Sequence, residues 1–177
     1  RDLFSHLCFA HSEDGERFSD DQIVKHMLGL MSAAHETTTS AIVAMAYALA
    51  KHPEVQERVR AELAAVGRDV PAYEDLDGLV YTTRVFQECL RLWGSSHTMP
   101  RKALRDVRYK EHVIPAGAMV FISPSFVHVM PEFWKDPELF DPERFAEDRK
   151  EHRQHRHLFM PFGGGAHKCI GMHLAEM

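Results

Sequence analysis

The sequence predicts a mainly α-helical chain that carries a small antiparallel β-sheet. A helical pattern runs from Ser19 to His52 with no breaker other than Gly29. Short β-type runs follow only after Met99, and the sequence "IPAG" between two of them is typical of a turn. Neither an internal repeat nor a low-complexity linker interrupts the 177 residues, which suit one domain or part of a larger one.

The composition is that of an ordinary soluble globular protein. It is 45% hydrophobic and 27% charged with a net charge of -5, which gives no reason to expect nucleic-acid binding. The longest apolar run, Ala41–Ala50, is far shorter than the roughly 20 residues that span a bilayer. Cys8, Cys89 and Cys169 are too few and too scattered for a disulfide framework, which favours a reducing compartment.

Three helices are expected in the first half of the chain. Ser19 and Gln22 form the N-terminal signal of the first, which would be about 30 residues long and buried, because it is apolar on nearly all sides. Pro53 opens a second helix that ends near Gly67. A third runs from about residue 79 to 93 and ends at Gly94.

The second half is expected to be less regular. The runs "VRY", "HVI" and "AMVFI" predict short strands, and three prolines then interrupt a stretch rich in aromatic residues. His152, His155 and His157 lie close together there, so a metal cluster is one interpretation. The flanking charges favour a solvated loop instead.

Four segments could carry chemistry. In "AAHETT", a carboxylate and a hydroxyl, Glu36 and Thr37, lie within an apolar helix, which is costly unless they are partnered. A core helix with satisfied hydroxyls is the plain alternative. In "ECLR", Glu88 and Arg91 share one helix face, and Arg144 in "DPERF" could reach a buried carboxylate; each spacing alone is weak evidence.

The fourth segment is "PFGGGAHKCIG", residues 161–171. A phosphate-binding loop needs Ser or Thr after the lysine, where Cys169 stands, and the glycine spacing does not match a dinucleotide fingerprint. A Cys-His protease lacks any local signature. A thiolate held by backbone N–H groups before a helix at Ile170, beneath a large flat cofactor, fits best and is typical of a haem ligand.

Together the four segments resemble the cytochrome P450 family, in the right order and over most of the chain. The resemblance implies that Cys169 is the axial thiolate of haem b (iron protoporphyrin IX). His167 and Arg101 would reach the propionates, Glu36 and Thr37 would manage protons, and residues 95–99 would border the substrate pocket. The other residues that would contact the haem are Ala33, Ala34, Phe162, Gly163, Gly165 and Gly171. Glu88, Arg91 and Arg144 would form a buried ion network bracing the cysteine.

The resemblance implies a monooxygenase that inserts one oxygen atom from O₂ into a small apolar organic substrate. A ferredoxin- or flavoprotein-type donor would supply the electrons. Another haem-thiolate type, such as a peroxygenase or isomerase, and a non-catalytic haem-binding fragment remain alternatives. The pair Glu36–Thr37 favours the monooxygenase, because only O₂ reduction needs two delivered protons.

Two departures qualify this resemblance. Gly94 and Ser95 stand where the family usually has one or two prolines, so the shape of the substrate pocket is open. The chain also starts at Arg1 and stops within an apolar helical pattern. Residues 1–177 are therefore expected to be the C-terminal haem-binding portion of a single P450 domain, inactive in isolation. A cytoplasmic, bacterial-like location is expected, with an anchor in the missing part left open.

Overall fold

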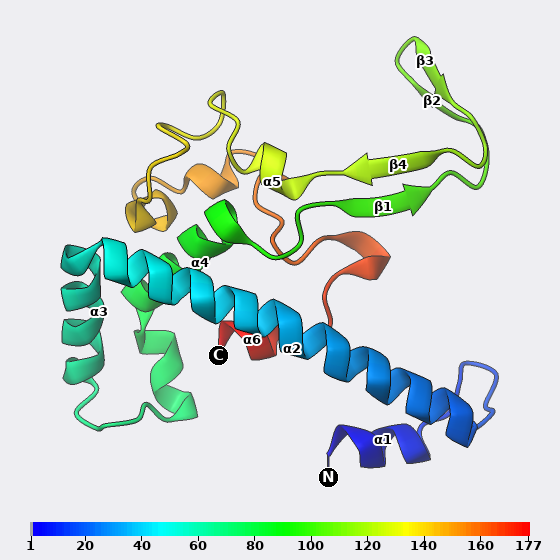
Figure 1. The fold of residues 1–177 in the computed structure, drawn as a ribbon, viewed down its shortest axis with the longest axis horizontal. Helices are drawn as coiled ribbons and strands as arrows, with labels where there is room; N and C mark the ends of the chain where they lie inside the picture. Colours follow the sequence, from blue (N-terminus) through cyan, green and yellow to red (C-terminus); the bar gives the residue numbers. More distant parts are fainter. Residues whose placement is uncertain (1) are drawn as a thin grey trace. The chain divides into compact units, whose positions relative to one another are not determined.

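The computed structural model, whose ribbon is drawn in Figure 1, describes residues 2–177. The chain divides into two compact units. One unit ends at Thr39 and the other begins at Ser40. The architecture is mainly helical with short antiparallel strands, which confirms the predicted fold class. No helix within residues 2–177 is long and apolar enough to cross a membrane.

The first unit contains helix α1 (Leu3–Phe9) and the first part of helix α2 (Asp20–Lys51). Asp2 caps α1 by accepting the Ser5 N–H at 2.8 Å. Ser19 and Gln22 cap α2 reciprocally: the Gln22 side chain accepts the Ser19 N–H at 2.9 Å, and the Ser19 hydroxyl accepts the Gln22 N–H at 3.3 Å. The predicted start of this helix is therefore confirmed.

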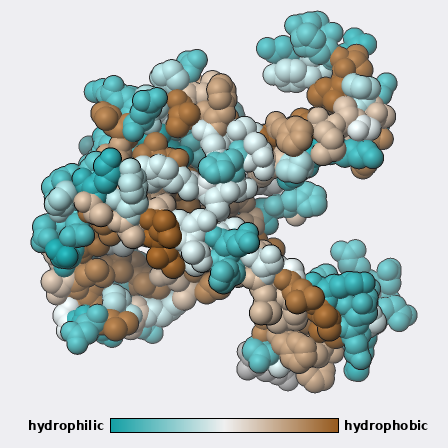
Figure 2. Space-filling model, in the orientation of Figure 1, coloured by the Kyte–Doolittle hydropathy of each residue, from teal (hydrophilic) through white to brown (hydrophobic). Residues whose placement is uncertain are grey.

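The expectation that α2 is buried is wrong for most of its length. Ala44 and Ala48 are buried, but residues 31–40 are all exposed. Large apolar side chains of α2 also lie at the surface, and Figure 2 shows apolar surface on the face that it draws. These side chains are Val24, Leu28, Met31, Ile42, Val43 and Tyr47. Apolar composition on all sides indicated burial, but only the face of Ala44 and Ala48 joins the core cluster.

The second unit is built on helices α3 (Pro53–Ala65) and α4 (Val80–Trp93), joined through the 3₁₀ segment η1 (Tyr73–Gly78). Pro53 stands at the first helical position of α3, as predicted. The last turns of α2 pack with α3 and α4 around one apolar core. Its buried members are Ala44, Ala48, Val55, Val59, Tyr81, Val85 and Cys89.

Four short strands form two separate two-stranded antiparallel sheets. Strand β1 (Met99–Lys102) pairs with β4 (Met119–Ile122), and β2 (Val107–Tyr109) pairs with β3 (His112–Ile114). The strands predicted after residue 106 are confirmed. Strand β1 was not predicted, because "MPRK" lacks β-type alternation and contains a proline.

The remaining elements are short, and a second apolar cluster lies among residues 127–159. These elements are α5 (Pro124–Val127), η2 (Pro142–Phe145), η3 (Glu151–Arg153), η4 (Gly165–His167) and α6 (Met172–Glu176). Trp134 and Leu158 are almost completely buried in this cluster with Phe145. The aromatic stretch between α5 and η2 therefore folds around its own core rather than lying loose on the surface.

A carboxylate from α3 caps α4. Arg58 lies four residues from both Glu54 and Glu62 on α3, but it pairs with Glu143 at 2.6 Å. Glu62 instead accepts the N–H groups of Tyr81 and Thr82 at 2.7 and 2.8 Å. Both donors belong to the first turn of α4, whose N–H groups have no partner within the helix.

Replacing Glu62 by alanine is expected to lower the free energy of unfolding by about 1–2 kcal/mol, because it exposes these donors and removes a favourable charge at a helix N-terminus. Glu57→Ala is the matched control, since Glu57 lies on the same helix in an exposed pair with Arg60. That variant should change stability by less than about 0.5 kcal/mol. Urea denaturation of the two variants measures the difference, and equal effects would refute the cap.

Candidate functional site

Helix α4 holds a completely buried ion pair. Glu88 and Arg91 lie three residues apart with 0% and 1% of their surface exposed. The arginine binds the carboxylate through two parallel bonds of 2.7 Å, from Nε to Oε2 and from Nη2 to Oε1. Such a bidentate pair is stronger and geometrically more specific than a single contact.

Arg144 reaches the same carboxylate from η2. Its Nε donates to Glu88 Oε1 at 3.3 Å, and it is 1% exposed. The structure thus brings together Glu88, Arg91 and Arg144, which we call the arginine network. A buried carboxylate between two guanidinium groups is compensated in charge, which burial requires.

The arginine network also organises the chain between α5 and η2. Arg91 donates to the carbonyls of His128, Pro137 and Leu139 at 2.8, 2.7 and 3.3 Å. Arg144 donates to Asp136 at 2.6 Å and Leu139 at 3.2 Å, and also to Lys135. These carbonyls belong to irregular backbone, so their hydrogen-bond donors are the two guanidinium groups and not the N–H groups of a helix or sheet.

A second set of charged side chains surrounds the arginine network, and the sequence analysis did not predict it. Glu151 binds Arg144 at 2.9 Å and also pairs with Arg149, which in turn binds Asp141 at 2.6 Å. The Asp141 N–H donates to Glu88 at 2.9 Å, which closes a ring. Burial alone would raise the pKa of Glu151, but its bonds to Arg149 and Arg144 hold that pKa below the ordinary value.

His128 joins the arginine network to the segment before the cysteine. Its carbonyl accepts from Arg91, and its ring Nε2 accepts the Met160 N–H at 3.0 Å. It is only 2% exposed. Burial, aided by the positive charge of Arg91, lowers the pKa of His128 from 6.5 to about 4. In the sequence, the one signal of this buried role is a polar residue among the apolar residues of "FVHVM".

This lowered pKa predicts a specific loss of stability in acid. The unfolded imidazole takes up a proton near pH 6.5 and the folded one near 4, so the contribution of neutral His128 is complete above about pH 6.5. It declines as the pH falls through this window, by about 2 kcal/mol between roughly pH 7.5 and 5. Urea unfolding at both pH values should show a smaller decline for His128→Gln. An equal decline would refute the assignment.

The predicted ligand Cys169 lies in the segment Pro161–Gly171, which we call the cysteine loop. Its side chain is exposed and unpaired, and its N–H donates to the Phe162 carbonyl at 2.9 Å. Cys89, in contrast, is buried, and burial together with the charge of Glu88 raises the pKa of its thiol to about 12. Cys89 therefore remains protonated, whereas Cys169 stands open to a ligand.

Two glycines give the cysteine loop its shape. Gly163 and Gly165 have φ of +71° and +70°, a region that other residues rarely adopt. A Cβ at Gly163 would also lie 3.1 Å from the sulfur of Met99, so the loop passes close to β1. The helix expected at Ile170 begins two residues later, at Met172, because residues 170 and 171 form a turn.

These residues fit a haem better than a bare metal ion. No group of three or more His, Cys, Asp or Glu within residues 2–177 is arranged to hold a metal. A zinc ion needs three or four protein ligands, whereas haem iron takes its other ligands from the macrocycle and can use a single thiolate. The single exposed cysteine in a glycine-rich loop matches what haem iron needs, which is one thiolate ligand.

The predicted distal residues lie on α2, within the unit that ends at Thr39. Ala33, Ala34, Glu36 and Thr37 are all exposed in the described part of the chain. The Thr37 hydroxyl donates to the Ala33 carbonyl at 2.6 Å, which is a back-bond along the helix. Because the Thr37 hydroxyl already donates its proton to Ala33, its oxygen can only accept a hydrogen bond from another molecule. That these residues face the same haem as Cys169 stays a prediction.

The predicted propionate partners are accessible. Arg101 lies on β1, half-buried, with Nη1 on the Pro100 carbonyl at 2.8 Å, and His167 ends η4 exposed to solvent. The predicted substrate border, residues 95–99, is tied to the start of α5. There His97 Nδ1 lies 3.0 Å from the Ser125 hydroxyl, a contact that sequence reasoning missed.

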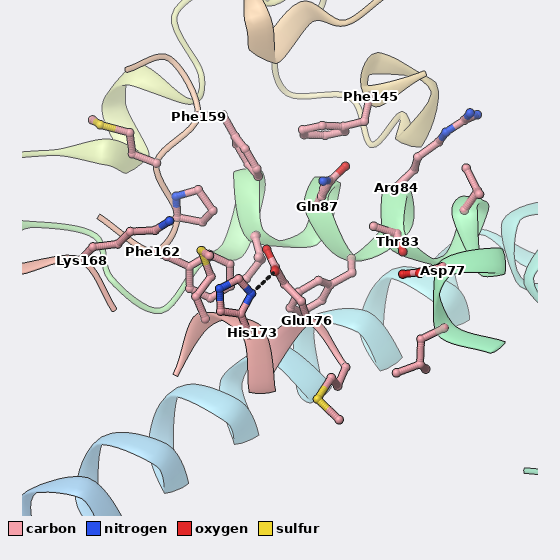
Figure 3. A pocket seen from close by; sticks show the side chains of 18 of the residues that line it. Asp77, Thr83, Arg84, Gln87, Phe145, Phe159, Phe162, Lys168, His173 and Glu176 are labelled. Carbon is pink, nitrogen blue, oxygen red and sulfur yellow. Dashed lines mark ion pairs between the residues drawn. The ribbon is translucent and has the colours of Figure 1, made fainter. Parts of the chain in front are cut away.

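A pocket of about 990 Å³ lies beside α4 (Figure 3). Thr83 and Gln87 line it from α4, Phe159 from the segment before the cysteine loop, and Phe162 and Lys168 from the loop itself. Cys169 is not among its lining residues. This pocket therefore borders the cysteine loop on the side of α4.

Within residues 2–177, the histidines near residue 155 do not form a group of three or more side chains that could hold a metal ion. His155 and His157 are exposed with ring centres 5.6 Å apart. His152 differs, because its ring packs on Phe145 at 4.9 Å and burial lowers its pKa. It belongs to the aromatic cluster rather than to a metal.

Comparison with known proteins agrees with this geometry. The family model for Cytochrome P450 matches residues 1–177. The chain belongs to the cytochrome P450 family, and membership implies a haem cofactor.

Individual relatives are similar over almost the whole chain. A Mycobacterium tuberculosis protein assigned as cytochrome P450 136 is 46% identical over 97% of this chain and 35% of its own length. Cyclooctat-9-en-7-ol 5-monooxygenase of Streptomyces melanosporofaciens is 39% identical over 98% of this chain and 38% of its own length. The solved structure of retinoic acid-bound cyanobacterial CYP120A1 superposes with a TM-score of 0.93 at 31% identity, covering 98% of this chain and 40% of that one. The chain thus spans little more than a third of the curated relatives it matches.

Proposed function

We propose that the chain is the cysteine-bearing part of a haem b monooxygenase acting on a small apolar organic substrate. The balanced reaction takes the substrate, O₂, two electrons and two protons to a hydroxylated product and water. The observation that carries the proposal is the exposed Cys169 thiol in a loop whose backbone is held by the Cys169 N–H to Phe162 carbonyl bond. When bound, the haem would supply O₂ binding and oxygen transfer.

The residues of this chain would hold and shield the cofactor. Cys169 would ligate the iron, while Phe162, Gly163, Gly165 and Gly171 would allow the haem to lie close to the loop. His167 and Arg101 would bind the propionates, because both are accessible cations or donors that can reach a carboxylate. Ala33 and Ala34 would border the opposite face, where their small side chains leave room.

Proton delivery would fall to two neighbouring residues. The Thr37 proton is already donated to the Ala33 carbonyl, so its oxygen would accept a hydrogen bond and position a water or a reactant. A carboxyl group can both donate and accept, so Glu36 would be the group that moves protons from solvent. Thr37 positions and Glu36 transfers.

The electron donor and the location complete the proposal. A ferredoxin- or flavoprotein-type partner would deliver the two electrons one after the other, as the family resemblance implies. Free cysteines at positions 8, 89 and 169 fit a reducing compartment, for which we propose the cytoplasm. The monooxygenase named among the relatives supports the reaction type.

The ligand assignment is tested by spectroscopy on the whole protein. Reduced and exposed to CO, it should show the far-red-shifted Soret band of thiolate-ligated haem, and Cys169→His should remove that band. Cys89→Ala is the matched control and should keep it, because that thiol is buried and protonated. A Cys169→His protein that retained the shifted band would overturn the proposal.

A further inference from the structure

His128 is held on three sides by hydrogen bonds that leave it little freedom. Its own N–H donates to the Pro124 carbonyl at 2.8 Å, its carbonyl accepts from Arg91 at 2.8 Å, and its ring accepts from Met160 at 3.0 Å. The side chain is 2% exposed, and its ring lies 5.3 Å from that of Phe159. This residue contacts both the arginine network and the backbone that precedes the cysteine loop.

The ring must accept a hydrogen bond at Nε2. A backbone N–H can only donate, so the bond from Met160 requires a lone pair on that nitrogen. The imidazole is therefore neutral and carries its proton on Nδ1. A protonated ring would place two donors against each other and break the contact.

Two further bonds carry the position of Met160 to the cysteine. The Met160 carbonyl accepts the Gly163 N–H at 3.0 Å, and the Phe162 carbonyl accepts the Cys169 N–H at 2.9 Å. Residues 160–163 are thus a short bonded path between the histidine ring and the backbone of Cys169.

We propose that His128 is a positioning residue that couples the arginine network to the cysteine loop through its Nε2 bond to Met160. The role rests on the proposed function of Cys169 as haem ligand. In the part of the chain that the structure describes, Glu88, Arg91 and Arg144 form no hydrogen bond or ion pair with residues 161–171. His128 therefore connects the arginine network to the segment that leads into the loop.

Three substitutions separate the hydrogen bond from the packing. His128→Phe keeps an aromatic ring against Phe159 and removes the acceptor. His128→Gln keeps an acceptor at the reach of Nε2, and His128→Asn, a milder variant, carries an amide too short to meet Met160. His152→Phe is the matched control, because His152 also packs near Phe159, at 6.2 Å, and has no bond to Met160.

Two measurements on the whole haem-loaded protein decide the matter. Amide hydrogen exchange at Met160, Gly163 and Cys169 should become roughly tenfold faster in the Phe and Asn variants. In their reduced CO complexes, part of the Soret intensity should move from the red-shifted band of thiolate-ligated haem to the shorter wavelength of haem without a thiolate ligand. His128→Gln should restore both readouts toward wild type, and His152→Phe should change neither.

The outcomes distinguish this proposal from the assignment of Cys169. If the Phe and Asn variants exchange at the wild-type rate, or if the Gln variant is as defective as they are, His128 does not position the loop. If the wild-type protein lacks the red-shifted Soret band, the haem-thiolate proposal fails. Amide exchange still decides whether His128 holds Met160.

Discussion

Arg91→Ala is expected to yield a protein that does not retain haem. The substitution leaves Glu88, which is 0% exposed, with a single cationic partner at 3.3 Å. It also removes the arginine donor from the carbonyls of His128 and Pro137, while the Leu139 carbonyl keeps its bond from Arg144. Breaking a buried pair costs roughly 3–5 kcal/mol. A typical domain has only about 5–15 kcal/mol of stability, so a large share is lost. Haem content per purified protein and the midpoint of thermal unfolding measure the effect.

Two companion variants sharpen this experiment. Arg91→Lys keeps the charge but loses the planar fork that binds Glu88 twice and the carbonyls of His128 and Pro137, so an intermediate loss is expected. Arg60→Ala removes an exposed ion pair with Glu57 and should behave like wild type. Full haem loading and an unchanged midpoint in Arg91→Ala would show that the arginine network has no structural value.

Glu36→Gln and Thr37→Ala are expected to damage turnover in different ways. Removing a positioned proton donor typically costs about 10²–10⁴-fold, so Glu36→Gln should slow product formation strongly. Thr37→Ala loses the oxygen that positions a reactant, so the protein should still consume reducing equivalents and O₂. It should then release hydrogen peroxide, which needs the same two electrons and two protons but leaves the substrate unchanged. Product formed per electron pair is the measurement.

Thr39 supplies the control for this pair. Its hydroxyl donates to the His35 carbonyl at 2.7 Å, the same back-bond that Thr37 makes to Ala33. Two residues along a helix lie on nearly opposite faces, so Thr39→Ala should remove an equivalent bond and keep coupling intact. If Thr37→Ala also keeps wild-type coupling and Glu36→Gln keeps the wild-type rate, both residues are polar residues of the helix with no role in turnover.

Local signals in the sequence predicted helix boundaries well. The start of α2 at Asp20 and of α3 at Pro53 follow from a capping pair and a first-turn proline, whose effects act within a few residues. The burial of α2 was predicted poorly, because burial depends on which elements lie against a helix. Strand β1 was missed because "MPRK" carries no local β signal, and its hydrogen-bond partner β4 lies about 20 residues further along.

The candidate site divides in a similar way. The spacing of Glu88 and Arg91 predicts that they can meet, since both lie on one helix face. Nothing local indicates that Arg91 also binds carbonyls 37 to 48 residues away, or that His128 holds Met160. These contacts depend on how irregular backbone returns to α4. The ligand role of Cys169 follows from its glycine-rich loop together with the family resemblance, and the proton roles of Glu36 and Thr37 follow from the resemblance; all three stay predictions.

The arginines of the network bind main-chain oxygens in residues 135–139, not side chains. A carbonyl is present whichever residue occupies the position, so most substitutions there leave the acceptors in place. An insertion or deletion would instead move every later carbonyl out of reach. This stretch can therefore drift in composition but not in length. Exposed positions within it, such as Glu138 and Leu139, are suitable places to attach a fluorescent or spin label close to the network without disturbing it.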